Sequence, residues 1–169
     1  MAPAAIVITT VVILLAMGRR WWCACESPVP FSFDVNSSHN SQHLFDPYSF
    51  THVLHGFLLY ALLWLVARQT PLRTRLAVAL ALEALWEILE NSPPVIDRFR
   101  QTAVSLDYIG DSIGNSLGDL ASCAMGFGLA AVLPVWASVA WFLASEIVLY
   151  LWIKDGLLLA FTSLLFPRR

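Results

Sequence analysis

The sequence predicts an all-α polytopic transmembrane helix bundle with five to six membrane segments, and three observations support this prediction. Hydrophobic residues make up 58% of the 169 residues and charged residues only 13%, whereas a soluble domain carries about a quarter charged residues. The apolar residues gather in runs of roughly 17–25, the length that a helix needs to cross about 30 Å of hydrocarbon. Every tryptophan except Trp141 lies near a predicted end of such a run, where amphipathic rings favour lipid headgroups.

Composition also limits the classes of function. The formal net charge of −2 excludes a nucleic-acid binder built on a basic face, so the lipid bilayer is the partner that we expect. Three cysteines, Cys23, Cys25 and Cys123, are too few for a disulfide scaffold. The sequence carries no signal for an oligomeric state.

The first two elements are an apolar run and a polar loop. No Lys or Arg precedes the run over residues 1–17 and no small-residue cleavage site follows it, so we expect a retained first span rather than a signal peptide. The polar segment 18–49 lacks helical or strand periodicity and predicts a loop outside the membrane. Within it, Cys23 and Cys25 form either a redox or metal site or two thiols beside an interfacial tryptophan pair. The tract 36–43 is either a solvated loop or a lid.

Prolines and charges bound the later elements. The second span is expected over 50–67, closed by a basic turn, and the third over 76–91, stopped by Pro93-Pro94. A loop over 92–107 then leads to the fourth and fifth spans. The short apolar stretch at the end predicts a half-helix, a thin sixth span or an interfacial segment. These last three elements, within a single integral membrane domain over 1–169, cover 108–133, 135–153 and 157–166.

Helices joined by short loops alternate in direction, which places most polar residues of the spans on one side. We call the side of the loop 18–49 side A. Glu83, Glu87 and Glu90 share one helix face at 100° per residue, and His52 and His55 share another at i and i+3. The residues expected at or near side A are His52, His55, Glu83, Glu87, Glu90, Asn91, Asp107, Asp111, Asn115, Asp119 and Glu146.

Acids within the spans require compensation. A carboxylate at the bilayer centre costs about 2.5–3.5 kcal/mol on insertion scales, and the predicted spans contain no Lys or Arg. The missing positive charge is therefore a bound cation, a shared proton or the head of a substrate. The alternative is a set of protonated acids hydrogen-bonded between helices. Beside the acids, Gly110, Gly114 and Gly118 form a small-residue stripe that predicts close approach of another helix.

Imidazole together with carboxylates suits zinc, manganese or iron, so a divalent metal is one candidate cofactor, although the sequence does not identify a cofactor. In this hypothesis His52, His55, Glu87 and Asp111 are metal ligands, and Glu83 or Asp107 is a general base. The other members of the polar site are Glu90, Asn91, Asn115, Asp119 and Glu146.

Several motifs resemble an uncharacterised family of bacterial multi-pass inner-membrane proteins. They are Trp86-Glu-Ile-Leu-Glu-Asn-Ser-Pro93, Ser105-Leu-Asp-Tyr-Ile-Gly-Asp-Ser112, Cys23-Ala-Cys25, Asn40-Ser-Gln-His43, His52 and His55-Gly56. The resemblance covers most of the chain and implies a bacterial inner-membrane location, but no established activity. Lys154-Asp155-Gly156 departs from the Arg-Asp-Asn expected there, which puts that corner in doubt as a site. A fainter similarity to VanZ-like membrane proteins rests on Asp111, Asn115 and Gly118.

Three functions follow as hypotheses. The first is a polar, metal-binding intramembrane site open to side A that acts on a lipid or cell-envelope substrate by metal-assisted hydrolysis or transfer, although no nucleophile stands out. The second is a proton- or cation-coupled transporter, and the third is a non-catalytic structural or assembly factor. Basic residues occur on both sides, but Arg68, Arg73 and Arg75 share one short turn on side B. The positive-inside rule is most reliable for short loops, so we expect side A to be periplasmic.

Overall fold

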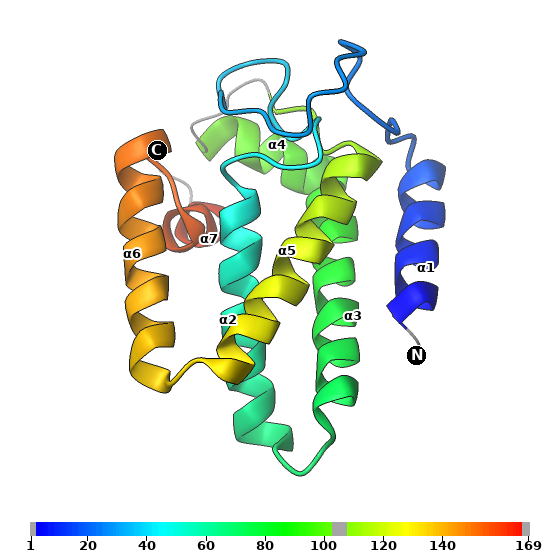
Figure 1. The fold of residues 1–169 in the computed structure, drawn as a ribbon. Coiled ribbons are helices and arrows are strands. Elements are labelled where there is room, and N and C mark those ends of the chain that lie inside the picture. Colours follow the sequence, from blue (N-terminus) through cyan, green and yellow to red (C-terminus); the bar gives the residue numbers. More distant parts are fainter. Residues whose placement is uncertain (1–2, 103–107, 167–169) are drawn as a thin grey trace.

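The computed structural model describes residues 3–102 and 108–166, and these ranges form seven α-helices (Figure 1). The all-α prediction is confirmed. In chain order the helices are α1 (Pro3–Ala16), α2 (Ser49–Ala67), α3 (Leu72–Glu90), α4 (Pro93–Thr102), α5 (Ile113–Val132), α6 (Val135–Ile153) and α7 (Leu157–Leu165).

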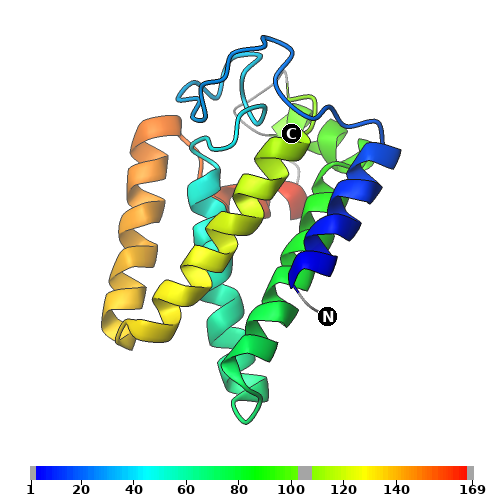
Figure 2. The same ribbon diagram turned by 45° about the vertical axis from the view of Figure 1, so that its right-hand side comes forward.

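Five helices form an up-and-down bundle, whereas two short helices lie outside this pattern. Figures 1 and 2 show α2, α3, α5 and α6 running between the same two ends and the shorter α1 beside part of α3, with successive members reversing direction. The α1–α2 loop and α4 cover one end, and α7 lies across the bundle near that end. Below this end the core is apolar, with Leu63, Ala79 and Phe127 joining α2, α3 and α5.

Most predicted boundaries agree with the helices, and the exceptions have local causes. The third helix begins at Leu72 instead of residue 76, because Pro71 occupies its N-cap position. The predicted loop 92–107 contains α4, since proline is tolerated in the first turn of a helix. The predicted span 108–133 becomes helical only at Ile113, where Ser112 caps α5 and accepts a hydrogen bond from the Asn115 amide at 3.1 Å.

Two of the described helices, α2 and α6, are long and apolar enough to cross a membrane by length and composition. Helix α1 is equally apolar but has 14 residues. Helices α3 and α5 have 19 and 20 residues, and they bury polar side chains such as Glu83, Glu87 and Asp119. The figure of five to six spans therefore stays a prediction.

Glycines allow α2 and α5 to cross in backbone contact. A Cβ added at Gly56 would overlap the Cys123 carbonyl, and one at Gly126 would overlap the Val53 carbonyl. The predicted stripe of glycines has a different neighbour. Gly114 and Gly118 pack against Trp22 and Leu44 of the α1–α2 loop, not against another helix. The expectation that this stripe serves helix–helix packing is wrong.

Candidate functional site

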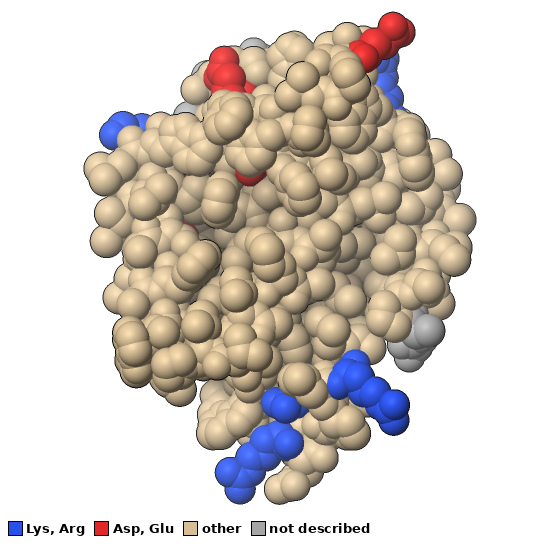
Figure 3. Space-filling view, in the orientation of Figure 1, with Lys and Arg blue, Asp and Glu red and all other residues tan. Residues whose placement is uncertain are grey.

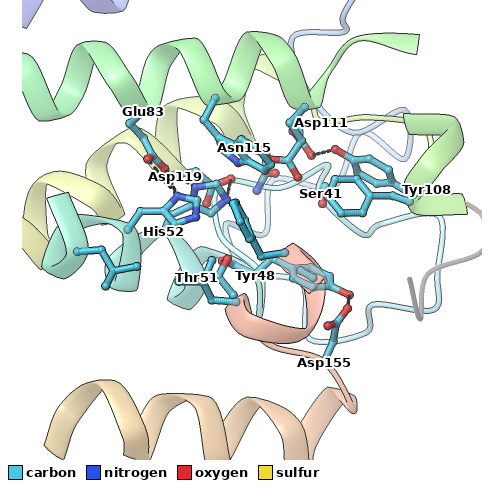
Figure 4. A pocket seen from close by; sticks show the side chains of 18 of the residues that line it. Ser41, Tyr48, Thr51, His52, Glu83, Tyr108, Asp111, Asn115, Asp119 and Asp155 are labelled. Carbon is cyan, nitrogen blue, oxygen red and sulfur yellow. Dashed lines mark hydrogen bonds and ion pairs between the residues drawn. The ribbon is translucent and has the colours of Figure 1, made fainter. Parts of the chain in front are cut away.

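A pocket of about 270 Å³ lies at the loop-covered end of the bundle. Its polar part is formed by α2, α3, α5 and the segments that precede α2 and α5. Its apolar part is formed by α2, α3 and α7. Figure 4 shows Glu83, His52, Asp119, Asn115 and Asp111 following one another along the polar wall. No Lys or Arg belongs to the lining within the described part of the chain.

The centre of the polar wall is a cluster of two imidazoles around one carboxylate. His52 Nδ1 lies 2.6 Å from Glu83 Oε1, and His55 Nδ1 lies 2.9 and 3.0 Å from the two Glu83 oxygens. Residues 52 and 55 meet Glu83 because they share one face of α2, as their i, i+3 spacing predicts. His52 also faces two further acids, with Nδ1 3.4 Å from Glu87 Oε1 and Nε2 3.8 Å from Asp119 Oδ2.

Glu87 is the most enclosed acid of this cluster. Its side chain is 0% exposed, and neither carboxylate oxygen has a hydrogen-bond partner among the described residues. Its ion-pair contact is with His52, whose Nδ1 lies 3.4 Å from Glu87 Oε1. A buried carboxylate with incomplete hydrogen bonding is costly, because a charge taken from water must be compensated. Glu87 is therefore a group that a cation would satisfy.

Asp111 belongs to a separate, saturated network. Its carboxylate accepts hydrogen bonds from the Tyr108 hydroxyl at 2.9 Å and from Asn91 Nδ2 at 2.7 Å, and its amide donates to Asn91 Oδ1 at 2.7 Å. Burial raises the pKa of Asp111 to about 6, although the hydrogen bonds from Tyr108 and Asn91 oppose the rise. Asp111 lines the same pocket as the two histidines, but the structure does not group it with them.

The other predicted site residues divide between the pocket and more distant places. Asp119 accepts a hydrogen bond from Ser49 Oγ at 2.7 Å, and Asn115 has a buried Nδ2 without a partner among the described residues. Glu90 lines the pocket and has one carboxylate oxygen without a partner there. Glu146 instead accepts the Leu157 and Leu158 amides and so caps α7. Asp107 lies outside the described residues.

Several pocket residues have no counterpart among the predicted site residues. Tyr48 lines the pocket and donates to Asp155 Oδ2 at 3.3 Å, and Tyr108 holds Asp111 (Figure 4). Asp46 accepts the amides of Ser41, Tyr48 and Ser49 and shapes the turn into α2. The sequence Asp46-Pro-Tyr-Ser49 is a recognisable Asx turn before a helix, but it carries no signal for a pocket.

Three groups of side chains bring possible metal-ligand atoms within 4.8 Å of one another. Two of them share His52, one with His55 and Glu83, the other with Glu87 and Glu90, and all of these residues except Glu87 line the pocket. The third group lies in the α1–α2 loop, away from the helical cluster. It contains Cys23, Cys25, His39 and His43, and the structure joins its two cysteines in a disulfide.

Comparison with known proteins places the chain among uncharacterised bacterial proteins. Residues 14–169 match the family described as "Protein of unknown function (DUF2585)". A UPF0314 protein of Paracoccus denitrificans is 46% identical over 154 residues, which cover 91% of this chain and 80% of that protein. UPF0314 proteins of Agrobacterium fabrum and Rhizobium etli are 44% and 43% identical over 97% and 98% of this chain, and over 83% and 85% of their own lengths. No solved structure matches the chain.

Proposed function

Because the chain belongs to the DUF2585 family, whose function is unknown, we propose its role from the site itself. In this proposal it is a multi-pass protein of the bacterial inner membrane that holds a divalent metal ion at His52, His55, Glu83 and Glu87. The ion serves hydrolysis or group transfer on a lipid or cell-envelope molecule. The similarity to VanZ-like proteins stays a prediction and carries no part of the proposal.

The distribution of surface charge supports a membrane location. Figure 3 shows Lys and Arg at the two ends of the molecule, with a broad band between them that is almost free of surface charge. Helix α6 buries only Leu149 and Ile153, and its exposed side chains include Trp136, Leu143 and Leu151. Exposed apolar surface of this extent exceeds what a soluble monomer tolerates, so lipid is the solvent that suits it.

The observation that carries the metal proposal is the surroundings of Glu87. Its carboxylate is fully buried and makes no hydrogen bond within the described residues, and Glu83 and Asp119 lie on either side of the same His52 ring. Two imidazoles, even if both were protonated, could not neutralise four buried acids and the half-buried Glu90. A divalent ion would supply the missing charge. The acids concerned are Glu83, Glu87, Glu90, Asp111 and Asp119.

The ligand set also favours particular metals. Imidazole nitrogen with carboxylate oxygen and no sulfur suits zinc, manganese or iron. Such an ion supplies Lewis-acid polarisation and an activated water when bound. Glu83 lies within 3.0 Å of both rings, so these three side chains would hold the ion together. Glu90, which lines the pocket with a carboxylate oxygen lacking a partner there, is the group placed to accept a proton.

The shape of the pocket favours a lipid substrate. The exposed residues of its lining are apolar, with Leu58, Leu82 and Phe161 being 48%, 40% and 53% exposed. These three side chains come from α2, α3 and α7, so the mouth opens on the flank of the bundle that would face acyl chains. A molecule with an apolar tail at this mouth would bring its polar head to His52 and Glu83.

The decisive experiment measures zinc and manganese binding to Glu87→Gln and to Glu26→Gln, a matched substitution of an exposed loop acid. Detergent-purified protein is stripped with a chelator and assayed without reductant, which keeps Cys23 and Cys25 joined. We expect a metal-dependent rise in the unfolding temperature for wild type and Glu26→Gln, reflecting about 2.7 kcal/mol when free metal is a hundred times Kd. Glu87→Gln should weaken binding at least tenfold, because it removes a charged ligand.

The apo form of Glu87→Gln provides the control for folding. Replacing a buried charge with a neutral amide should leave the metal-free protein at least as stable as wild type. If neither wild type nor Glu26→Gln gains stability with any divalent metal, the metal-centre proposal is wrong. Proton coupling would then be tested through proton uptake by reconstituted vesicles.

A further inference from the structure

We propose that Cys23, Cys25, His39 and His43 form a second metal site, a tetrahedral zinc site that fastens the α1–α2 loop over the pocket. This inference does not depend on the proposed function, because it concerns different ligands in a different part of the chain. Two sulfurs and two imidazoles are a typical ligand set for structural zinc. Their spacing, Cys-x-Cys followed by His-x3-His, lies within one loop of the chain.

The distances among the four ligand atoms support zinc. Bond lengths of about 2.3 Å to sulfur and 2.0–2.1 Å to nitrogen place tetrahedral sulfur and nitrogen ligands about 3.6 Å apart and two nitrogens about 3.3 Å apart. In the structure His39 Nδ1 lies 3.6 Å from Cys23 Sγ, and His43 Nε2 lies 3.8 Å from Cys25 Sγ. The two nitrogens are 3.2 Å apart. These three distances match the edges of a zinc tetrahedron.

Neighbouring backbone groups fix the tautomer of His43 and favour the thiolate form of Cys23. His43 Nδ1 lies 2.6 Å from the Val29 carbonyl, which can only accept, so this nitrogen must donate. The neutral ring then keeps its lone pair on Nε2, the atom that faces the cluster. The Cys25 amide donates to Cys23 Sγ at 3.2 Å, a contact that stabilises a thiolate. Backbone partners that fix a ligand's tautomer and charge are typical of metal sites.

The disulfide between Cys23 and Cys25 defines the condition for binding. A dithiol reductant must first reduce it: two electrons and two protons convert the disulfide to two thiols, and the reductant becomes a disulfide. Zinc then displaces both thiol protons as it binds the two thiolates and the two neutral imidazoles. The loop therefore has two closed forms, one joined by sulfur and one joined by metal.

The position of the ligands explains what the zinc would hold. Residues 40–42 lie between the two histidines, and they connect the loop to the pocket and to α5. Ser41 accepts the Ser112 amide at 2.9 Å, and Gln42 Nε2 donates to the Gly110 carbonyl at 2.8 Å. Asn40 and Ser41 also line the pocket. Metal ligation by His39 and His43 would thus clamp the turn that forms one wall of the pocket.

The test uses cobalt(II), which replaces zinc and absorbs strongly in the near ultraviolet only when thiolates bind it. Full-length protein is purified in detergent, reduced with a dithiol, freed of the dithiol without access to oxygen, and titrated with cobalt and then with zinc. We expect wild type to develop the thiolate–cobalt absorption and to lose it as zinc is added. Unreduced wild type and reduced Cys23→Ser/Cys25→Ser should not develop it, and each should bind one zinc fewer than reduced wild type.

Two further variants keep the outcome decisive. His52→Ala/His55→Ala removes helical imidazoles only and should retain the absorption, so failure of one metal site is distinguishable from failure of the other. His39→Ala/His43→Ala keeps both thiols and should weaken cobalt binding at least tenfold. Circular dichroism and protection of the buried Cys123 thiol confirm folding of each variant. Absence of the absorption in folded, reduced wild type, or its persistence without Cys23 and Cys25, would overturn the proposal.

Discussion

At the residue scale, two buried acids at the same end of the bundle have opposite surroundings. Asp111 receives two side-chain hydrogen bonds, whereas Glu87 receives none from the described residues. Both are buried, so the difference lies in the partners that the fold supplies. Hydrogen bonds to Asp111 come from Asn91 and Tyr108, which makes it a structural junction between α3 and the segment before α5. In the proposed function, the bound metal ion supplies the partner that Glu87 lacks among the described residues.

Asp111 should make stability depend on pH. Its folded pKa of about 6 lies above the unfolded value of about 3.9, so this carboxyl contributes stability that is fully present below about pH 4 and lost as pH rises through 6. The loss amounts to about 3 kcal/mol at most. Asp111→Asn should remove this part of the dependence. The measurement compares the unfolding temperatures of metal-free wild type and Asp111→Asn at pH 5 and pH 8. Identical changes in the two proteins would show that Asp111 does not titrate in this range.

At the element scale, the crossing of α2 and α5 determines where the helical metal cluster can form. Gly56 and Gly126 bring the two backbones together just below His52 and His55. Two glycines of α5 differ sharply in their surroundings. A Cβ at Gly126 would overlap the Val53 backbone, whereas one at Gly128 would meet nothing within 4 Å. The pair separates the effect of close packing from the effect of adding a methyl group to a helix.

Gly126→Ala should therefore destabilise the protein by about 1–3 kcal/mol, the usual cost of overpacking a core. Gly128→Ala should leave stability unchanged or raise it by up to about 1 kcal/mol, because alanine favours a helix more than glycine does. Thermal unfolding is followed by reaction of the buried Cys123 thiol with a dye. Equal unfolding temperatures for the two variants would contradict the backbone contact between α2 and α5.

Helix boundaries are predicted more accurately in apolar runs bounded by proline or charge than in irregular segments. The second and fifth predicted spans agree with α2 and α6 to within a residue, because proline or charge bounds each run. Helix α4 escaped prediction because Pro93-Pro94 is a stop for the preceding helix and also a permitted start for the next. A rotation of 100° per residue predicts that Glu83 and Glu87 lie on one face of α3. In the structure both side chains are buried and both lie near His52.

Contacts through irregular segments could not be predicted in this way. Asp111 turns toward Asn91 and Tyr108 because the chain before Ile113 is not helical, so Asp111 does not share a helix face with Asn115 and Asp119. His39 and His43 meet Cys23 and Cys25 through a loop whose path depends on many single hydrogen bonds. No period in the sequence encodes such a path, although the His-x3-His spacing was visible.

At the scale of the whole molecule, the arginines at the two ends differ in their hydrogen bonding and exposure. Three arginines at the loop-covered end donate to backbone carbonyls: Arg19 to Ile109, Arg98 to Leu164 and Arg100 to Tyr108. At the opposite end Arg68 and Arg73 are exposed around the short α2–α3 turn. Free basic residues in a short loop are those that the positive-inside rule counts, so the α2–α3 turn should face the cytoplasm.

Reporter fusions test this orientation. Green fluorescent protein fused after residue 69 should fluoresce, and alkaline phosphatase fused after residue 154 should be active, because the two points lie at opposite ends of the bundle (Figure 1). Exchanging the reporters between the two points should abolish both signals. The reverse pattern would place the pocket on the cytoplasmic side, and activity of one reporter at both points would contradict a membrane-spanning bundle.

The cap of α5 bears on the order in which the protein assembles during synthesis. Its first amides donate to carbonyls of the α1–α2 loop, Ile113 to Arg20 at 2.8 Å and Gly114 to Trp21 at 3.1 Å. The loop is synthesised long before α5. It must therefore be folded, or fold again, when α5 is made, because it supplies the acceptors for the first amides of that helix. A nascent chain whose loop has not yet folded would leave the leading amides of α5 without these acceptors. We therefore expect correct packing of α5 to depend on a loop that is already in place.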